Sequence, residues 1–197
     1  MDLFPTLITA IAAYLLGSVP FGLVMARAFG LGDLRQIGSG NIGATNVLRT
    51  GNKLAALLTL IGDAGKGAAA VLLARWLIGE GAAGIAALFA MLGHLYSIFL
   101  GFKGGKGVAT FLGTLLALSF PVGLAACATW LTTAIIFRFS SLSALVAAIL
   151  SPVYMLIFYH WHGALLVAIL AALIIFKHRA NIARLRDGSE PKIGSKS

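Results

Sequence analysis

The chain has 197 residues, of which 59% are hydrophobic and 11% are charged, and its mean hydropathy is +0.97. Soluble domains carry about 25% charged residues, so this composition excludes a soluble globular protein and indicates an integral membrane protein. The net charge of +9 fits basic cytoplasmic loops and contact with anionic lipid headgroups. We therefore expect membrane lipids as partners and no nucleic acid.

Residues that bind metals or act in familiar hydrolytic sites are scarce. The single cysteine, Cys127, excludes a disulfide within the chain, and six acidic residues give little material for a metal site. The Gly-x-Ser-x-Gly motif of serine hydrolases is absent, as is the His-x-x-x-x-Asp arrangement of many acyl-transferring enzymes. We expect no metal ion and no cofactor.

Seven apolar runs predict an all-α membrane protein with seven transmembrane helices, organised as a single bundle over residues 1–197. A helix of about 20 apolar residues crosses the hydrocarbon core of a bilayer. The first run, at 3–25, has no charge and no signal-type cleavage site, so we expect a retained helix. The later runs lie at 57–78, 82–100, 108–119, 122–137, 142–159 and 164–176, of which 108–119 is short for a span.

Basic residues lie on alternate connections and predict the orientation of the helices. They occur after the first, third, fifth and seventh runs, whereas the connections at 79–81, 120–121 and 160–163 contain no Lys or Arg. Because basic residues in short loops favour the cytoplasmic side, we expect the N-terminus outside and the C-terminus in the cytoplasm. All the polar, glycine-rich loops then lie on the cytoplasmic face.

The first glycine-rich segment, 38–46, combines glycines with hydrogen-bonding Ser, Asn and Thr. Successive backbone N–H groups with little side-chain bulk can converge on one oxyanion. The Gly-x-Gly-x-x-Gly spacing that begins at Gly38 matches the dinucleotide fingerprint, but that motif needs a preceding strand in a βαβ unit, so we reject this interpretation. Two interpretations remain: an anion-binding loop, with Arg49 one helical turn further on, or an ordinary flexible loop.

The second glycine-rich segment, 104–107, interleaves lysine with glycine and leads directly into the run at 108. The free N–H groups and the positive dipole end of a helix starting there favour an anion. Its spacing does not match the Walker motif. The alternative is a basic cytoplasmic loop with helix-breaking glycines.

Asp63 and Lys66 are charged residues inside the second apolar run. Each isolated charge costs roughly 2.5–3.5 kcal/mol near the bilayer centre, so something compensates them. Their i, i+3 spacing allows an ion pair on one helix face, and we hold that structural role equal to a functional one. If this helix starts near Asp63, both groups lie at the inner interface beside the loops.

Among the histidines, His178 is the candidate for function. It follows the last apolar run and adjoins Arg179 and Asn181, on the face predicted to carry the loops. We expect His94, inside the third run, to be a core histidine with its hydrogen bonds satisfied.

Taken together, three ordered motifs and a matching tail are distributed over nearly the whole chain: Ser39-Gly40-Asn41-x-Gly43-x-Thr45-Asn46-x-x-Arg49, Asp63-x-x-Lys66-Gly67, Gly93-His94 through Gly104-Gly105-Lys106-Gly107-Val108-Ala109-Thr110, and Ser140-Ser141-Leu142-Ser143 with His178-Arg179-x-Asn181-Ile182-x-Arg184-Leu185, Gly188 and Glu190. They resemble the bacterial acyl-phosphate:glycerol-3-phosphate acyltransferases. The resemblance implies transfer of a fatty acyl group from acyl phosphate to the 1-hydroxyl of glycerol 3-phosphate, giving lysophosphatidic acid and phosphate in the first step of phospholipid synthesis. It also implies seven helices in the bacterial cell (inner) membrane, a cytoplasmic active site and no metal.

The candidate site residues follow from the loops and from this resemblance. As catalytic residues we predict Ser39, Asn41, Thr45, Lys106 and His178. As substrate-binding residues we predict Gly40, Gly43, Asn46, Arg49, Asp63, Lys66, Lys103, Gly104, Gly105, Gly107, Ser141, Ser143 and Asn181. The expected substrates are glycerol 3-phosphate and a long-chain acyl phosphate.

Two other functions remain open at the level of the sequence. A transporter of small phosphorylated anions would also have interrupted helices and basic loops, but transporters more often show inverted repeats, which we do not see. A purely structural membrane subunit would leave the glycine-rich polar motifs without a role.

Overall fold

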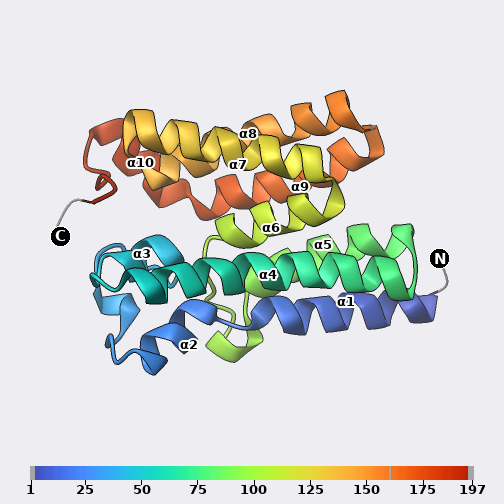
Figure 1. Ribbon diagram of the computed structural model, residues 1–197, viewed down its shortest axis with the longest axis horizontal. Helices are drawn as coiled ribbons and strands as arrows, with labels where there is room; N and C mark the ends of the chain where they lie inside the picture. The colour runs from blue at the N-terminus through green and yellow to red at the C-terminus, as the bar shows by residue number, and fades with distance from the viewer. Residues whose placement is uncertain (1–2, 160, 195–197) are drawn as a thin grey trace. The chain divides into compact units, whose positions relative to one another are not determined.

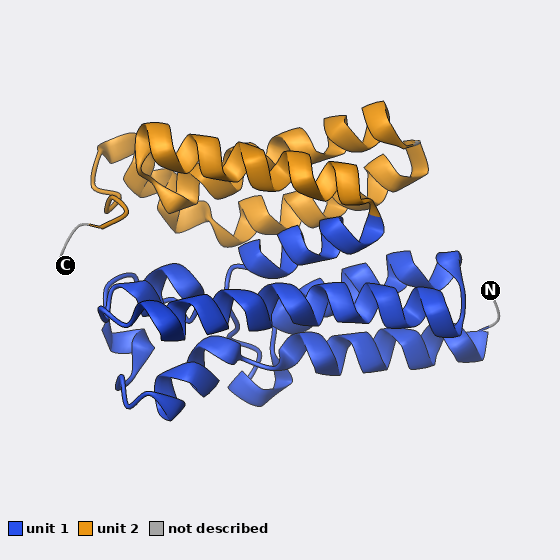
Figure 2. Ribbon diagram, in the orientation of Figure 1, with its two compact units in different colours: residues 1–118 blue, residues 119–197 orange. Residues whose placement is uncertain are grey.

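The computed structural model describes residues 3–159 and 161–194, and within those ranges the chain forms helices and no strands. Residue 160 of the connection at 160–163 lies outside the described residues. The chain divides into two compact units, 1–118 and 119–197 (Figure 2). The single bundle over 1–197 stays a prediction.

The first unit contains six α-helices and two short 3-10 helices, labelled in Figure 1: α1 Leu3–Ser18, α2 Phe21–Ala28, η1 Leu34–Gln36, α3 Ala44–Leu48, α4 Lys53–Leu77, α5 Glu80–Leu95, η2 Ile98–Leu100 and α6 Val108–Leu118. The second unit contains α7 Phe120–Phe137, α8 Ser140–Phe158, α9 Trp161–Lys177 and α10 Arg179–Asp187.

Within the described residues, five helices are long and apolar enough to cross a membrane, at Leu3–Ala28, Lys53–Leu77, Glu80–Leu100, Phe120–Phe137 and Ser140–Phe158. A sixth span results if α9 and α10, which bend by 60° at their junction, are taken together. Helix α6 is apolar but shorter. The all-helical membrane fold is therefore confirmed, while the count of seven spans and their orientation stay predictions.

Two helix boundaries differ from those expected. The first predicted helix is broken between α1 and α2 because Pro20 disfavours a helical conformation at Val19 and has no N–H to donate. The second begins at Lys53, where the Asn52 side chain accepts a hydrogen bond from the Ala55 N–H and so caps the helix. Asp63 therefore lies well inside α4, and the alternative that this helix starts near Asp63 is wrong.

Small residues bring the helices of the first unit into close contact. A side chain at Gly17 or Gly93 would overlap the facing backbone of α5 or α1 respectively, and one at Gly113 of α6 would overlap the α4 backbone at Ala64. Between α1, α4 and α5 the core consists of alanines, such as Ala86. Close backbone approach through small residues is typical of helix packing in membranes.

The side chain of Arg75, near the end of α4, contacts the start of α5 and the end of α6. Its Nε donates to Glu80 at the start of α5 over 2.7 Å, and its terminal nitrogens donate to the carbonyls of Ala117, at 2.6 Å, and Leu118, at 3.1 Å. These carbonyls belong to the last turn of α6, which has no intrahelical donors for them. Arg75 therefore has a structural role at the end of α4, which is the end away from the glycine-rich loops.

Candidate functional site

The Ser39 loop is folded around the side chain of Asn46. Asn46 is 2% exposed, and its Oδ1 accepts a hydrogen bond from the Ser39 N–H at 3.1 Å while its Nδ2 donates to the Leu34 carbonyl at 2.9 Å. Gly40, at φ +67°, occupies the left-handed region that favours glycine. The buried Asn46 side chain therefore holds the loop in shape from the side of the core, while Ser39 remains exposed.

Arg49 lies directly against this loop. It follows the short helix α3 and occupies the C-cap position of that helix. A side chain at Gly38 would come within 2.9 Å of an Arg49 guanidinium nitrogen and within 2.7 Å of Asn46 Oδ1. Because Gly38 has no side chain, the guanidinium of Arg49 fits against the segment that contains Ser39.

The Lys106 loop packs onto the end of α5 through its glycines. The Gly104 N–H donates to the Leu95 carbonyl at 3.3 Å, and the Gly105 N–H donates to the His94 carbonyl at 3.1 Å. A side chain at Gly104 would overlap the backbone carbonyl of His94. The amides of these two glycines are thus used within the protein, and the predicted donors to an anion are confined to the end of the loop and the first turn of α6, which begins at Val108.

A buried charged cluster lies beneath this loop. Lys66 Nζ donates to Asp63 Oδ1 at 2.8 Å and to the Val19 carbonyl at 2.7 Å, and the two charged side chains are 1% and 3% exposed. His94 Nδ1 lies 3.6 Å from Asp63 Oδ1, and His94 Nε2 faces Gly105. Asp63 and Lys66 therefore have partners inside the unit, which favours the ion-pair alternative over direct binding of substrate.

In the second unit, the predicted residues gather around the start of α8 and the α9–α10 junction. Ser143 is fully buried, and its hydroxyl donates to the Phe139 carbonyl at 2.8 Å. His178, 3% exposed, occupies the N-cap position of α10 without a side-chain capping bond, and its Nδ1 lies 2.8 Å from the Ile174 carbonyl. Because a carbonyl only accepts, Nδ1 carries the proton in the neutral ring, and Nε2 is the acceptor nitrogen.

Glu190 holds the tail of the second unit in place. Its carboxylate accepts from Asn181 Nδ2 at 2.6 Å and from Arg184 Nε at 2.7 Å. Partial burial raises the pKa of the Glu190 carboxyl, but the neighbouring Ser141, Asn181 and Arg184 side chains outweigh this effect and hold its pKa below the usual value. Glu190 orients Asn181, a role that the sequence did not assign to it.

The lowered pKa predicts a pH dependence for this tail. A carboxyl whose pKa is lower in the folded state stabilises that state above its unfolded pKa of about 4.3 and loses the contribution as the pH falls through the folded value. We expect amide hydrogen exchange over residues 179–193, corrected for the intrinsic rate, to accelerate in this acidic range.

The Glu190→Gln variant should show the loosened tail already at neutral pH, with faster tryptic cleavage at Arg184 and Arg186. Glu80→Gln, which removes a carboxylate paired with an arginine in the first unit, serves as the control and should leave cleavage of the tail at nearly the original rate. Equal protection of the tail in Glu190→Gln and the unmodified protein would contradict the anchoring role.

These features define a class: an all-helical integral membrane protein in which glycine-rich polar loops stand next to basic side chains. A family model described as glycerol-3-phosphate acyltransferase matches residues 7–188. The chain is 66% identical over 190 residues to a glycerol-3-phosphate acyltransferase of Jannaschia sp. (strain CCS1), covering 96% of this chain and 94% of that protein. It is 60% identical to one from Cereibacter sphaeroides (strain ATCC 17025 / ATH 2.4.3), covering 99% and 93%.

Solved structures give the same result. The chain is similar to the crystal structure of PlsY (YgiH), an integral membrane glycerol 3-phosphate acyltransferase, in its glycerol 3-phosphate form, with a TM-score of 0.90, 40% identity and 96% of each chain covered. For the lysophosphatidic acid form the TM-score is 0.87 at 37% identity, with 96% of this chain and 95% of that chain covered. The chain belongs to the glycerol-3-phosphate acyltransferase family.

Proposed function

We propose that this protein transfers a fatty acyl group from a long-chain acyl phosphate to the 1-hydroxyl of glycerol 3-phosphate. Family membership supports the acyl transfer to glycerol 3-phosphate. The observation that carries the choice of an acyl phosphate is the pair of glycine-rich loops, each next to a cation, Arg49 and Lys106. A reaction with two phosphate-bearing substrates needs two such anion sites, and neither loop carries a metal-binding carboxylate.

The reaction asks for positioning and charge stabilisation more than for a strong base. The glycerol oxygen attacks the acyl carbonyl carbon, the carbon–oxygen bond to phosphate breaks, and phosphate leaves with the electron pair. The hydroxyl proton passes to an oxygen of the departing acyl phosphate. Holding the two reactants in line supplies roughly 7–11 kcal/mol, whereas a dedicated base typically contributes about 10²–10⁴-fold.

The site residues divide between the two substrates in this proposal. Gly40, Asn41, Thr45 and residues 106–107 serve the acyl-phosphate headgroup and the developing oxyanion, with Ser39 among the donors. Asn46 and Gly105 serve the same site indirectly, because their hydrogen bonds hold the two loops in shape. For glycerol 3-phosphate we assign Arg49, Ser143, His178 and Asn181, and we assign Lys106 to both substrates.

Asp63 and His178 are not equally suited to accept the hydroxyl proton in place of the acyl phosphate. Asp63 is buried and already accepts from Lys66, which disfavours it as a base. His178 presents Nε2 as its acceptor nitrogen, which suits it to hold the attacking hydroxyl. We therefore retain His178 as the alternative acceptor.

The loop geometry makes a direct prediction for Gly104. Alanine at this position would overlap the His94 carbonyl and push the Lys106 loop away from α5. We expect Gly104→Ala to lower the acyl-transfer rate about 10²-fold, since a misplacement of about 1 Å costs that much. Gly65→Ala, where a side chain meets open space on α4, should retain the rate. Full activity of Gly104→Ala would show that the packed loop is not needed.

We further propose that the chain is a single seven-span bundle in the bacterial inner membrane, with its loops and C-terminus in the cytoplasm. The alternation of basic connections supports this orientation. A cysteine at Ser39, in a chain with Cys127 replaced by alanine, should react with a membrane-impermeant thiol reagent only after the cytoplasmic side is opened. Labelling of intact cells from outside would overturn the orientation.

The product tests the proposed reaction. The protein in lipid nanodiscs, supplied with glycerol 3-phosphate and palmitoyl phosphate, should form lysophosphatidic acid with the ester on the 1-position, as read by mass spectrometry and carbon-13 NMR. An ester on the 2-position would contradict the regiochemistry. Binding of glycerol 3-phosphate without any ester product would favour a transporter of phosphorylated anions.

A further inference from the structure

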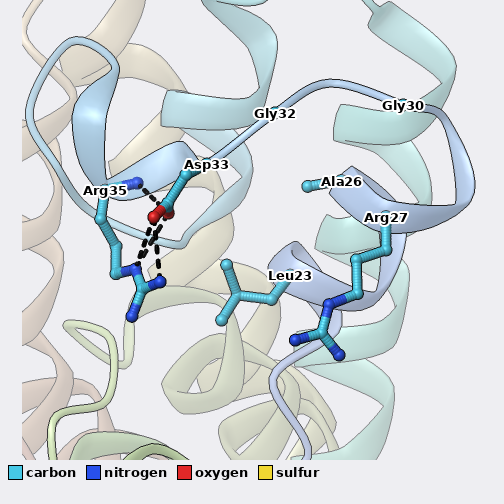
Figure 3. A pocket seen from close by; sticks show the side chains of 7 residues that line it. All are labelled: Leu23, Ala26, Arg27, Gly30, Gly32, Asp33 and Arg35. Carbon is cyan, nitrogen blue, oxygen red and sulfur yellow. Dashed lines mark hydrogen bonds and ion pairs between the residues drawn. The ribbon is translucent and has the colours of Figure 1, made fainter.

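A pocket outside the residues assigned to the reaction lies between α2 and η1 in the first unit. It has a volume of about 400 Å³ and is lined by Leu23, Ala26, Arg27, Gly30, Gly32, Asp33 and Arg35 (Figure 3). This volume is within the range of roughly 300–1,000 Å³ typical of small-ligand sites. None of these residues belongs to the predicted catalytic or substrate-binding set.

The walls of the pocket are held by the core of the unit. Ala26 and Leu34 are buried together with Val47 and Ala55, so α2 and η1 rest on the same hydrophobic cluster. The Leu31 N–H donates to the Ala26 carbonyl at 2.9 Å and closes the turn between them. A side chain at Gly30 or Gly32 would meet open space, so the volume beside this turn is not filled by the protein.

The charges in the pocket leave one cation without a partner. Asp33 and Arg35 form a paired contact with nitrogen–oxygen distances of 2.9 Å, and side-chain hydrogen bonds from Arg35 hold the pKa of Asp33 below its usual value. The guanidinium of Arg27 is exposed and makes no hydrogen bond or ion pair with the described part of the chain. Two arginines against one aspartate give the pocket a net positive charge.

The surroundings of the pocket favour an amphiphilic anion. Arg27 lies at the end of the candidate span Leu3–Ala28, the depth at which lipid headgroups meet a membrane protein. Figure 3 shows Leu23 between the Arg27 side chain and the Asp33–Arg35 pair. Val24, next to Leu23 on α2, is an apolar side chain that is 42% exposed. A ligand at this place would meet a cation and an apolar surface at once.

We propose that this pocket binds the headgroup of an anionic membrane phospholipid, with its phosphate on Arg27 and the start of its acyl region against Leu23. Arginine matches phosphate geometry with two parallel N–H donors and is weakly hydrated, which suits it to this contact. This pocket is separate from the residues proposed for acyl transfer. The lipid proposal therefore does not depend on acyl phosphate being the donor.

Native mass spectrometry of the purified protein in a neutral detergent tests this proposal. Saturating glycerol 3-phosphate is present to occupy the substrate site, and phosphatidylglycerol is titrated. We expect Arg27→Gln to weaken retention of one lipid at least about tenfold, the loss of one charge-assisted contact. Arg27→Lys should lie in between, and Arg186→Gln, which removes an exposed arginine outside the pocket, should match the unmodified protein.

Three results would overturn the proposal. Equal loss of lipid in Arg27→Gln and Arg186→Gln would reduce the effect to overall charge. Retention of diacylglycerol as tight as that of phosphatidylglycerol would make the pocket merely apolar. Displacement of the lipid by millimolar inorganic phosphate would identify a site for soluble anions.

Discussion

Replacing Lys106 with alanine is expected to lower kcat for acyl transfer about 10²–10³-fold, the usual cost of removing one preorganised donor to a developing oxyanion. Lys106 is half-buried in a loop whose glycines donate hydrogen bonds to the end of α5, so the backbone that carries its side chain is held in place before substrate arrives. The Arg49→Ala variant should instead raise KM for glycerol 3-phosphate most strongly, because arginine binds the phosphate in both the ground and transition states.

The measurement is steady-state kinetics with each substrate varied in turn. Lys53→Ala is the matched control for Lys106→Ala, since Lys53 is an exposed lysine at the start of α4. For Arg49→Ala the control is Arg186→Ala, an exposed arginine in α10. Full activity in either Arg49→Ala or Lys106→Ala would make the site model wrong.

The second large effect concerns stability. Replacing Asp63 with leucine leaves the Lys66 ammonium buried without its carboxylate, which typically costs about 3–5 kcal/mol. Replacing both residues with leucine removes both charges, and such double replacements of buried pairs are often nearly neutral. We therefore expect Asp63→Leu to lower the thermal unfolding midpoint strongly and Asp63→Leu/Lys66→Leu to recover most of that loss.

The same pair of variants separates the two roles that the sequence left open for Asp63 and Lys66. If the pair is structural, activity per folded molecule should return in the double variant along with stability. If Asp63 or Lys66 bound substrate, the double variant would be stable and inactive. Unchanged stability of Asp63→Leu would contradict the buried ion pair.

The sequence predicted elements whose signals are local. The apolar runs located the long helices, whereas the short helix α3, which ends next to Arg49, was not among the predicted elements. The break after Ser18 was also readable from Pro20, but the unbroken hydrophobicity on both sides concealed it. The start of α4 was placed too late because polar Asn52 and Lys53 lie outside the apolar run, although Asn52 is a good helix cap.

Contacts between distant residues were beyond the sequence. His94 was expected to be an ordinary core histidine, and the structure places it against Asp63 on one side and Gly105 on the other. Glu190 was noticed only as part of the tail, yet it binds Asn181 and Arg184. No periodicity connects such pairs, because each depends on how two helices pack together or on how a loop folds back onto a helix.

That acyl phosphate is the donor of the acyl group is tested most directly by comparing two donors. Phosphate release is followed with the purified protein in lipid, glycerol 3-phosphate and palmitoyl phosphate, with and without a metal chelator. When palmitoyl-CoA replaces the acyl phosphate, release of the CoA thiol is followed instead, because transfer from that donor frees CoA and not phosphate. We predict phosphate release that depends on glycerol 3-phosphate and is unaffected by the chelator, with no acyl transfer from palmitoyl-CoA. Turnover with palmitoyl-CoA and none with palmitoyl phosphate would contradict it.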